Sequence, residues 1–219
     1  PGLIVDRYGD VCVVQANTAG VDRLTDDILA ALDAVVAPAA VLLKNDSPAR
    51  KLEGLQLETR IVKGEVPGPI DLIENGARFV CDPAGGQKTG WFFDQRDNRA
   101  MVAGFAEGAR VLDTYAYAGG FGVLAAVNGA AEVHLVDRSQ PALDLARQSA
   151  ELNGVAARCH VTRTEVFDEL ASLDKQRERF DIVICDPPAF VKSRKDLKPA
   201  AQGYRKMTRL APPLVVKSG

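Results

Sequence analysis

Short apolar runs and one helical stretch make up the first part of the chain. The runs at residues 3–5, 11–14 and 40–43 are typical of strands, and the turn signal at residues 8–10 separates the first two. A long helical stretch that includes Thr25, Asp26 and Asp27 is predicted to end near Val36, before Pro38. This pattern indicates a small α+β unit.

A hairpin is predicted at the end of this unit. Two largely apolar segments, residues 70–73 and 78–81, flank Asn75 and Gly76, two residue types that tolerate positive φ. The Gly- and Pro-rich segment 64–69 before them reads as a surface connection. We therefore expect a small α+β domain over residues 1–82 and a second domain over residues 83–219.

Strands and helices alternate in the second part. This alternation predicts a parallel sheet with crossover helices, in which ligands bind at the carboxyl ends of the strands. The strands are expected at residues 110–115, 132–137, 158–162 and 180–186. Helices are expected at residues 121–128, 165–173 and 199–210. Another helix is expected to begin after Ser139 as its N-cap, with Pro141 in its first turn, and to end at Asn153 and Gly154.

Composition excludes several classes of protein. The 219 residues are 47% hydrophobic and carry a net charge of −2, which excludes a globally basic nucleic-acid coat but not a local basic face. No run approaches the ~20 apolar residues of a membrane span, and no signal peptide is visible. The four cysteines form no C-x-x-C pair, so a disulfide scaffold or zinc ribbon is not expected and a reducing cytoplasm is the default.

Candidate chemistry lies where the predicted strands end. Asp113 precedes a loop with Gly119, Gly120 and Gly122 that opens a helix. Glycines let the backbone approach a ligand, and a helix N-terminus favours an anionic group. Asp137 ends the next strand, where a carboxylate can hold two ribose hydroxyls. These residues predict a nucleotide-type cofactor at one edge of the sheet.

A second motif follows the last predicted strand. Pro187 and Pro188 come directly after Asp186, remove two backbone donors and stiffen the turn. The turn would present the Asp186 carboxylate to a planar substrate, and Phe190 would stack on its face. The alternative is a strand stopped by prolines, with Phe190 in the core.

The glycine loop has a further interpretation. Gly120-x-Gly122-x-x-Ala125 fits the dinucleotide fingerprint, so a nicotinamide-dependent oxidoreductase stays open. That hypothesis leaves residues 87–99 and 186–190 without a role.

Taken together, the motifs resemble a known family. The Asp113 glycine loop, the Val136-Asp137 pair and Asp186-Pro187-Pro188 look like those of class I S-adenosylmethionine-dependent methyltransferases. Four blocks narrow the resemblance to the large-subunit ribosomal RNA 5-methylcytosine methyltransferases, and the similarity covers nearly the whole chain. These blocks are residues 1–10, 87–99, 186–193 and 203–206.

The resemblance implies an α/β fold: a Rossmann-like class I methyltransferase sheet, C-terminally incomplete, after a small α+β domain. It also implies S-adenosylmethionine as cofactor and large-subunit ribosomal RNA as partner. Around the methionine part of the cofactor, the resemblance implies Asp113, Gly119, Gly120 and Gly122. It implies Asp137 at the ribose, Glu165 at the adenine, and Thr89, Gln95 and Arg96 in the block that closes over the amino-acid end. At the target base it implies Asp186, Pro187 and Phe190.

The chain departs from that family at both ends. The family usually carries an N-terminal RNA-binding PUA domain, which these residues do not contain. A class I methyltransferase sheet normally has seven strands, and about four are predicted here before Gly219. The Ser-Cys-Ser motif, whose thiolate adds to C6 of cytosine so that C5 can attack the methyl group, is expected beyond Gly219. The 219 residues alone are therefore expected to be a catalytically inactive fragment.

The chain's own cysteines and histidines are expected to be structural. Alternation directs Cys185 away from the Asp186 side chain, and the other three cysteines lie in predicted strands. His134 and His160 lack partners at metal-ligand spacing, so no metal is expected. For Trp91, Phe92 and Phe93, a cofactor wall and simple core packing both stay open.

Basic residues gather near the C-terminal end and indicate a phosphate-binding rim beside the base-binding motif. Alternatives are methylation of guanine N2, which needs no cysteine, and a non-catalytic RNA-binding module. The expected setting is the cytoplasm, without membrane attachment. The cations are Lys192, Arg194, Lys195, Lys198, Arg205, Lys206, Arg209 and Lys217, against Asp196 alone.

Overall fold

The computed structural model describes residues 2–191 and 197–216. The chain forms two compact units that interleave in sequence. The first consists of Pro1–Leu72 and Cys81–Phe93, and the second of Ile73–Val80 and Asp94–Gly219. The expected boundary between residues 82 and 83 falls inside the second segment of the first unit. The division into one domain over residues 1–82 and another over residues 83–219 stays a prediction.

A four-stranded sheet forms the first unit. Strands β1 and β2 pair antiparallel, β2 and β3 parallel, and β3 and β4 antiparallel. Helix α2 covers the sheet where Cys12, Val14, Val41 and Leu43 form a core. The elements are β1 (Leu3–Tyr8), β2 (Val11–Ala16), α1 (Ala19–Arg23), α2 (Thr25–Val35), β3 (Ala40–Asn45), α3 (Ala49–Leu52) and β4 (Glu58–Lys63).

The predicted strands at residues 3–5, 11–14 and 40–43 are confirmed, and the helical stretch is present as two helices that meet at Leu24. The edge strand β4 was not predicted. All but one of its residues are exposed, so its sequence lacks the apolar alternation that marks a half-buried strand.

Side chains from the sheet hold the segment after residue 81 within the first unit. The buried Lys44 ammonium donates a hydrogen bond to the Gly86 carbonyl, and Tyr8 Oη donates to the Thr89 carbonyl at 3.1 Å. Trp91 is buried in the same unit. Burial lowers the pKa of Lys44 below its ordinary value.

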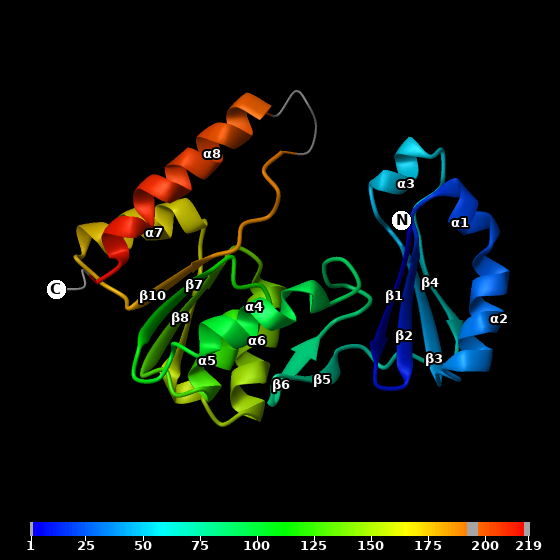
Figure 1. Ribbon diagram of the computed structural model, residues 1–219, viewed down its shortest axis with the longest axis horizontal. Coiled ribbons are helices and arrows are strands. Elements are labelled where there is room, and N and C mark those ends of the chain that lie inside the picture. Colours follow the sequence, from blue (N-terminus) through cyan, green and yellow to red (C-terminus); the bar gives the residue numbers. More distant parts are fainter. Residues whose placement is uncertain (1, 192–196, 217–219) are drawn as a thin grey trace. The chain divides into compact units, whose positions relative to one another are not determined.

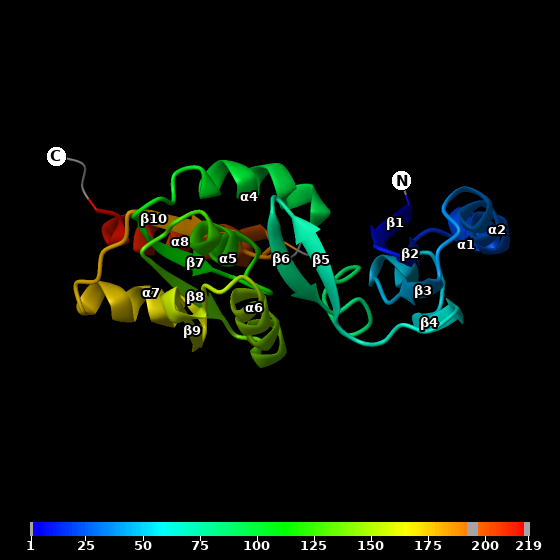
Figure 2. The same cartoon turned by 90° about the horizontal axis from the view of Figure 1, so that it is seen from below.

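The predicted hairpin is present as β5 (Ile70–Glu74) and β6 (Ala77–Cys81). Asn75 and Gly76 at its turn have φ of 52° and 79°. The part of the hairpin that belongs to the second unit, Ile73–Val80, packs beside α4 (Arg96–Ala103) and α6 (Gln140–Leu152), as Figure 2 shows. There the buried Glu74 carboxylate lies 2.5 Å from the Arg99 guanidinium, and Val80 donates its N–H to Ser149 Oγ.

The second unit is an α/β unit around a parallel sheet in the order β10-β7-β8-β9. This confirms the expected α/β Rossmann-like fold. The further elements are β7 (Arg110–Thr114), α5 (Gly120–Val127), β8 (Glu132–Asp137), β9 (Cys159–Arg163), α7 (Val166–Lys175), β10 (Ile182–Cys185) and α8 (Leu197–Leu210), with 3-10 turns at Phe93–Gln95, Ala156–Arg158 and Pro212–Leu214.

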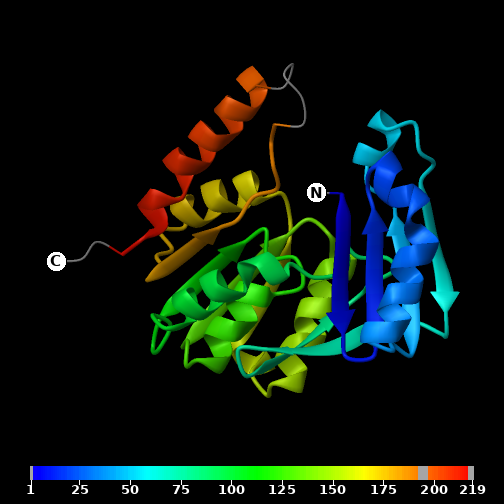
Figure 3. The ribbon, with the colours of Figure 1, turned by 45° about the vertical axis from the view of Figure 1, so that its right-hand side comes forward.

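Helices cover both faces of this sheet. Figures 1 and 3 show α7 and α8 together on one side and α5 with α6 on the other. Leu112, Val136, Leu170, Phe180 and Leu214 form the core on the α7 side. Past β10, Val215 bridges to Phe180 in parallel and continues the sheet at that edge. Across the described residues, no helix is both long and apolar enough to cross a membrane.

Candidate functional site

Three acidic residues share one edge of the parallel sheet. Thr114 pairs in register with Val136 of β8 and Cys185 of β10, so all three strands end within one residue of the same level. Thr114 Oγ1 also donates a 2.7 Å hydrogen bond to the Ile184 carbonyl and ties β7 to β10 there. The edge carries Asp113, Asp137 and Asp186, as their positions in the sequence predicted.

Asp113 is buried, with 1% of its surface exposed, and its Oδ2 accepts a 2.8 Å hydrogen bond from the Gly122 N–H. Burial raises its pKa to about 7, and the carboxylates of Asp186 and Asp137 act in the same direction. The Gly122 N–H and the Arg99 guanidinium oppose the shift. Asp113 is thus poised to ionise when a cation lies beside it.

Replacing Asp113 with asparagine is expected to remove a pH dependence of stability. The native carboxyl has its pKa near 7 and the unfolded one near 3.8, so the native state binds the extra proton between these values. The extra stability that this proton gives the native state is fully present below about pH 4 and is lost as the pH rises to about 7. Urea unfolding at pH 5 to 8 without cofactor should show wild type losing about 1 kcal/mol per pH unit relative to Asp113→Asn up to pH 7. A constant difference would contradict the burial argument.

The loop after β7 is held in an uncommon backbone conformation. Gly119, the N-cap of α5, is left-handed at φ 79°, and a Cβ there would lie 2.8 Å from Val123 Cγ2. Tyr115 and Tyr117 have φ of 60° and 49°, which non-glycine residues rarely adopt. Such strain persists where the surrounding structure fixes the loop, and it is common at ligand sites. Gly120 begins α5 directly after it.

Asp137 links this loop to the one after β8. Its Oδ2 accepts a hydrogen bond from the Tyr117 N–H at 3.0 Å, and its Oδ1 accepts from the Ser139 N–H at 2.9 Å. Two backbone donors therefore orient the half-buried carboxylate. Each oxygen of a carboxylate has two lone pairs, so both can accept a further hydrogen bond from a ligand hydroxyl.

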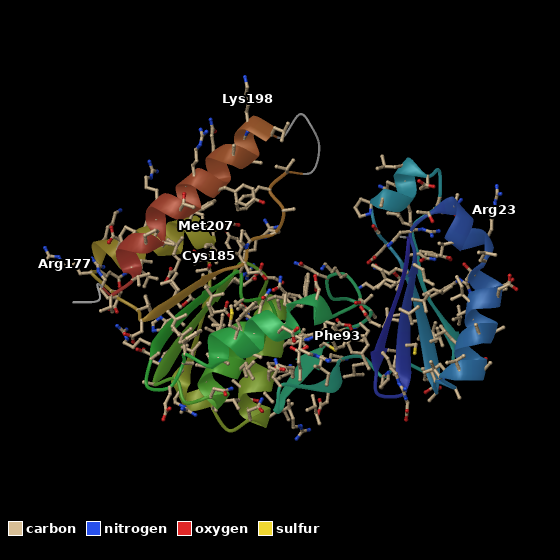
Figure 4. The ribbon with its side chains drawn as sticks, viewed as in Figure 1. Arg23, Phe93, Arg177, Cys185, Lys198 and Met207 are labelled. Atoms are coloured by element: carbon tan, nitrogen blue, oxygen red, sulfur yellow. The ribbon has the colours of Figure 1, made fainter. Side chains whose placement is uncertain are left out.

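Asp186 and Pro187 follow β10, with Asp186 exposed and Pro187 half-buried. Figure 4 labels Cys185 just before them. The half-buried Phe190 lies in an aromatic cluster, with ring centroids 4.7 Å from Tyr204, 6.2 Å from Phe167 and 6.4 Å from Tyr115. Its N–H also lies 3.4 Å from Tyr204 Oη. This cluster fixes where the loop after β10 places Phe190.

Glu165 follows β9 at the same edge and is the exposed N-cap of α7. Thr89 belongs to the first unit, where its Oγ1 donates a 2.5 Å hydrogen bond to Asp6 Oδ2. Gln95 and Arg96 belong to the second unit. Gln95 Oε1 accepts from Asn98 Nδ2, and Arg96 Nε lies 3.5 Å from Glu74 Oε2. Cofactor contacts of these three block residues stay a prediction.

The aromatic residues of the same block lie in the first unit. Phe93 packs on Tyr8 with ring centroids 5.3 Å apart, and the Lys88 ammonium lies 4.2 Å from the centre of the Phe92 ring. With Trp91 buried, these contacts fit the core-packing interpretation within that unit.

None of the four thiols is activated as a nucleophile. Burial raises the pKa of Cys12 and Cys185, that of Cys81 to about 12 and that of Cys159 to about 11. His134 Nε2 and His160 Nε2 lie 2.9 and 3.4 Å from Glu132 Oε1. Within residues 2–191 and 197–216, no group of three or more ligating side chains is placed to hold a metal ion.

Three residues that contribute to this site were not predicted from the sequence. Tyr204 and Phe167 hold Phe190 from α8 and α7, and Arg99 lies close enough to Asp113 to lower its pKa. Arg99 also stands near the Phe121 ring at the start of α5, 5.7 Å from its centre. The only signal was that Arg99 and Tyr204 lie inside blocks that carried the family resemblance.

The chain matches proteins of known class over its full length. A family model for S-adenosylmethionine-dependent methyltransferases matches residues 44–219. Ribosomal RNA large subunit methyltransferase I of Aeromonas hydrophila is 41% identical, and that of Erwinia tasmaniensis is 38% identical. Each alignment covers 100% of this chain and 56% of the relative, so the chain spans about half the length of these relatives.

Solved structures of methyltransferases also resemble this chain. The SMU.776 protein complexed with SAH superposes with a TM-score of 0.85 at 26% identity, over 100% of this chain and 56% of that one. A SAM-dependent methyltransferase from Streptococcus mutans gives a TM-score of 0.84 at 27% identity, over 100% and 55%. With the acidic residues and the glycine loop at one sheet edge, these matches show that the chain belongs to the S-adenosylmethionine-dependent methyltransferase family.

Proposed function

We propose that the whole protein transfers a methyl group from S-adenosylmethionine to C5 of a cytosine in large-subunit ribosomal RNA, in the cytoplasm. The observation that carries the proposal is the convergence of Asp113, Asp137 and Asp186 at one edge of the parallel sheet. Relatives named ribosomal RNA large subunit methyltransferase I, matched over the whole chain, support the choice of substrate.

The donor set of the edge fits S-adenosylmethionine, which supplies an activated methyl group. Asp137, oriented by two backbone N–H groups, holds the two ribose hydroxyls. Glu165 faces the adenine. Asp113 and the backbone of Gly119, Gly120 and Gly122 take the methionine part, and its ammonium favours the ionised form of the Asp113 carboxyl.

Thr89, Gln95 and Arg96 complete the amino-acid end of the cofactor in this proposal. The family assignment favours S-adenosylmethionine over a nicotinamide as the ligand of Gly120-x-Gly122-x-x-Ala125. For the target, Asp186 accepts a hydrogen bond from the exocyclic amine of a splayed-out base, Pro187 shapes the turn, and Phe190 contacts the face of the base.

Methylation of guanine N2 is the second candidate. The raised pKa of every thiol in the chain favours it, because attack by an amine needs no thiolate. Methylation of C5 needs a cysteine nucleophile from outside these 219 residues.

Nucleoside analysis tests the proposal. The complete gene product is incubated with S-adenosylmethionine and unmodified large-subunit ribosomal RNA, and the digested nucleosides are weighed by mass spectrometry. New 5-methylcytidine is the expected result. New N2-methylguanosine would replace the first candidate with the second. RNA affinity without any methylated nucleoside would overturn both in favour of a binding module.

A further inference from the structure

Helix α8 carries an unusual concentration of exposed positive charge. Its fourteen residues include Lys198, Arg205, Lys206 and Arg209 and no acidic residue. All four cations are exposed, and none forms an ion pair with a residue that the structure describes. The expected cations Lys192, Arg194, Lys195 and Lys217 lie outside the described residues.

Three of these cations form a straight line along the helix. At 3.6 residues per turn, positions 198, 205 and 209 fall on one face, and the 1.5 Å rise per residue spreads them over about 16 Å. We call Lys198, Arg205 and Arg209 the basic stripe. Figure 4 shows Lys198 projecting from α8 away from the sheet. Lys206 is directed differently, since its Nζ lies 4.6 Å from the centre of the Phe167 ring.

The opposite face of α8 is already occupied by the protein. Ala200 is buried, and Leu210 packs against the core that contains Phe180. A Cβ on Gly203 would lie 3.1 Å from the Phe190 ring, so helix and ring are in close contact. A helix that inserts into a lipid surface needs a free apolar face. Because that face of α8 is covered, its charge fits a polar polyanion better than a membrane.

The stripe also borders a hollow. An open surface hollow of about 330 Å³ is bordered by Lys198, Gln202 and Arg205 together with the apolar Leu197 and Ala201. Cationic and amide donors over an apolar floor suit a phosphodiester with its sugar, because guanidinium and ammonium groups bind phosphate oxygens.

We propose that the basic stripe binds the phosphate backbone of the RNA substrate; this inference rests on the proposed function. The same helix holds Phe190 through Gly203 and Tyr204, so backbone contacts on its outer face bring the strand close to the loop that takes the target base. Phosphate contacts of this kind fix position without reading sequence.

The salt dependence of RNA binding tests the stripe. The complete gene product is titrated into a fluorescein-labelled, 20-nucleotide, mixed-sequence single-stranded RNA between 50 and 200 mM KCl. Each lost phosphate contact lowers the slope of log K against log[salt] by about 0.7. Lys198→Gln/Arg205→Gln/Arg209→Gln should lower it by about 2, so wild type should lose about 20-fold more affinity than the variant over this range.

A matched variant removes three exposed cations elsewhere: Arg23→Gln/Lys51→Gln/Lys175→Gln. It should keep the wild-type slope, and Arg209→Gln alone should lower the slope by about 0.7. An unchanged slope for the stripe variant, with methyl transfer intact in wild type, overturns the inference alone. A reduced slope in a protein that methylates no RNA supports the stripe and overturns the proposed function. If the stripe variant loses binding to phosphatidylserine vesicles while its RNA slope equals that of wild type, the stripe binds a membrane and the inference is overturned.

Discussion

Asp186→Asn should lower the rate of methyl transfer to RNA by about 100-fold at saturating S-adenosylmethionine. Asp186 is exposed just past β10, where its carboxylate can accept a hydrogen bond from the base. An amide puts an N–H donor where the base presents its own, and loss of a hydrogen bond to a charged group costs about 1.5–3 kcal/mol, or roughly 10–100-fold in rate. Single-turnover transfer of a labelled methyl group from saturating S-adenosylmethionine measures the rate.

The matched control is Asp27→Asn, which neutralises an exposed carboxylate in α2 of the first unit. It should transfer methyl groups at the wild-type rate. If Asp186→Asn also stayed within twofold of wild type, Asp186 would have no role at the target base.

Gly122→Ala should destabilise the second unit and weaken cofactor binding together. The added Cβ would lie 2.5 Å from Leu135 Cδ2, 2.9 Å from Val133 Cγ1 and 3.0 Å from Asp113 Oδ2. Overpacking of this kind costs about 1–3 kcal/mol. Relief of the clash also moves the Gly122 N–H away from Asp113 Oδ2, so affinity for S-adenosylhomocysteine should fall at least about tenfold. Urea unfolding and calorimetric titration give the two quantities.

Gly20→Ala is the control for Gly122→Ala. Gly20 lies in α1, its φ is not positive, and a Cβ there meets nothing within 4 Å. Alanine has the higher helix propensity, so this variant should be as stable as wild type or more stable by about 0.5–1 kcal/mol. Equal unfolding free energies for the two variants would refute the steric argument for Gly122.

The second unit was predictable because its signals are local. Apolar runs gave the strands, and Ser139 caps α6 as expected, with its Oγ accepting from the Ala142 N–H. The edge strand β4 and helix α4 escaped prediction because tertiary contacts define them. The first half of α4 is entirely polar, and its Arg99 is fixed by Glu74, 25 residues earlier.

The candidate site divides in the same way. Asp113, Asp137 and Asp186 were found because each lies at or next to the end of a strand and the ends of parallel strands meet. The cluster around Phe190 was not, since Phe167 and Tyr204 come from two separate helices. Nor was the bond from Thr89 to Asp6, which spans 83 residues and places Thr89 in the first unit. No local pattern encodes such pairs.

We expect the shared edge of β7, β8 and β10 to hold S-adenosylmethionine through Asp137. Calorimetric titration of S-adenosylhomocysteine into wild type, Asp137→Asn and the exposed control Asp144→Asn tests it most directly. Hydrogen bonds to a charged group contribute about 1.5–3 kcal/mol each. We therefore expect Asp137→Asn to bind about 100-fold more weakly, with Asp144→Asn equal to wild type. Equal affinity of Asp137→Asn and wild type would mean that Asp137 does not bind the cofactor and would place the cofactor elsewhere.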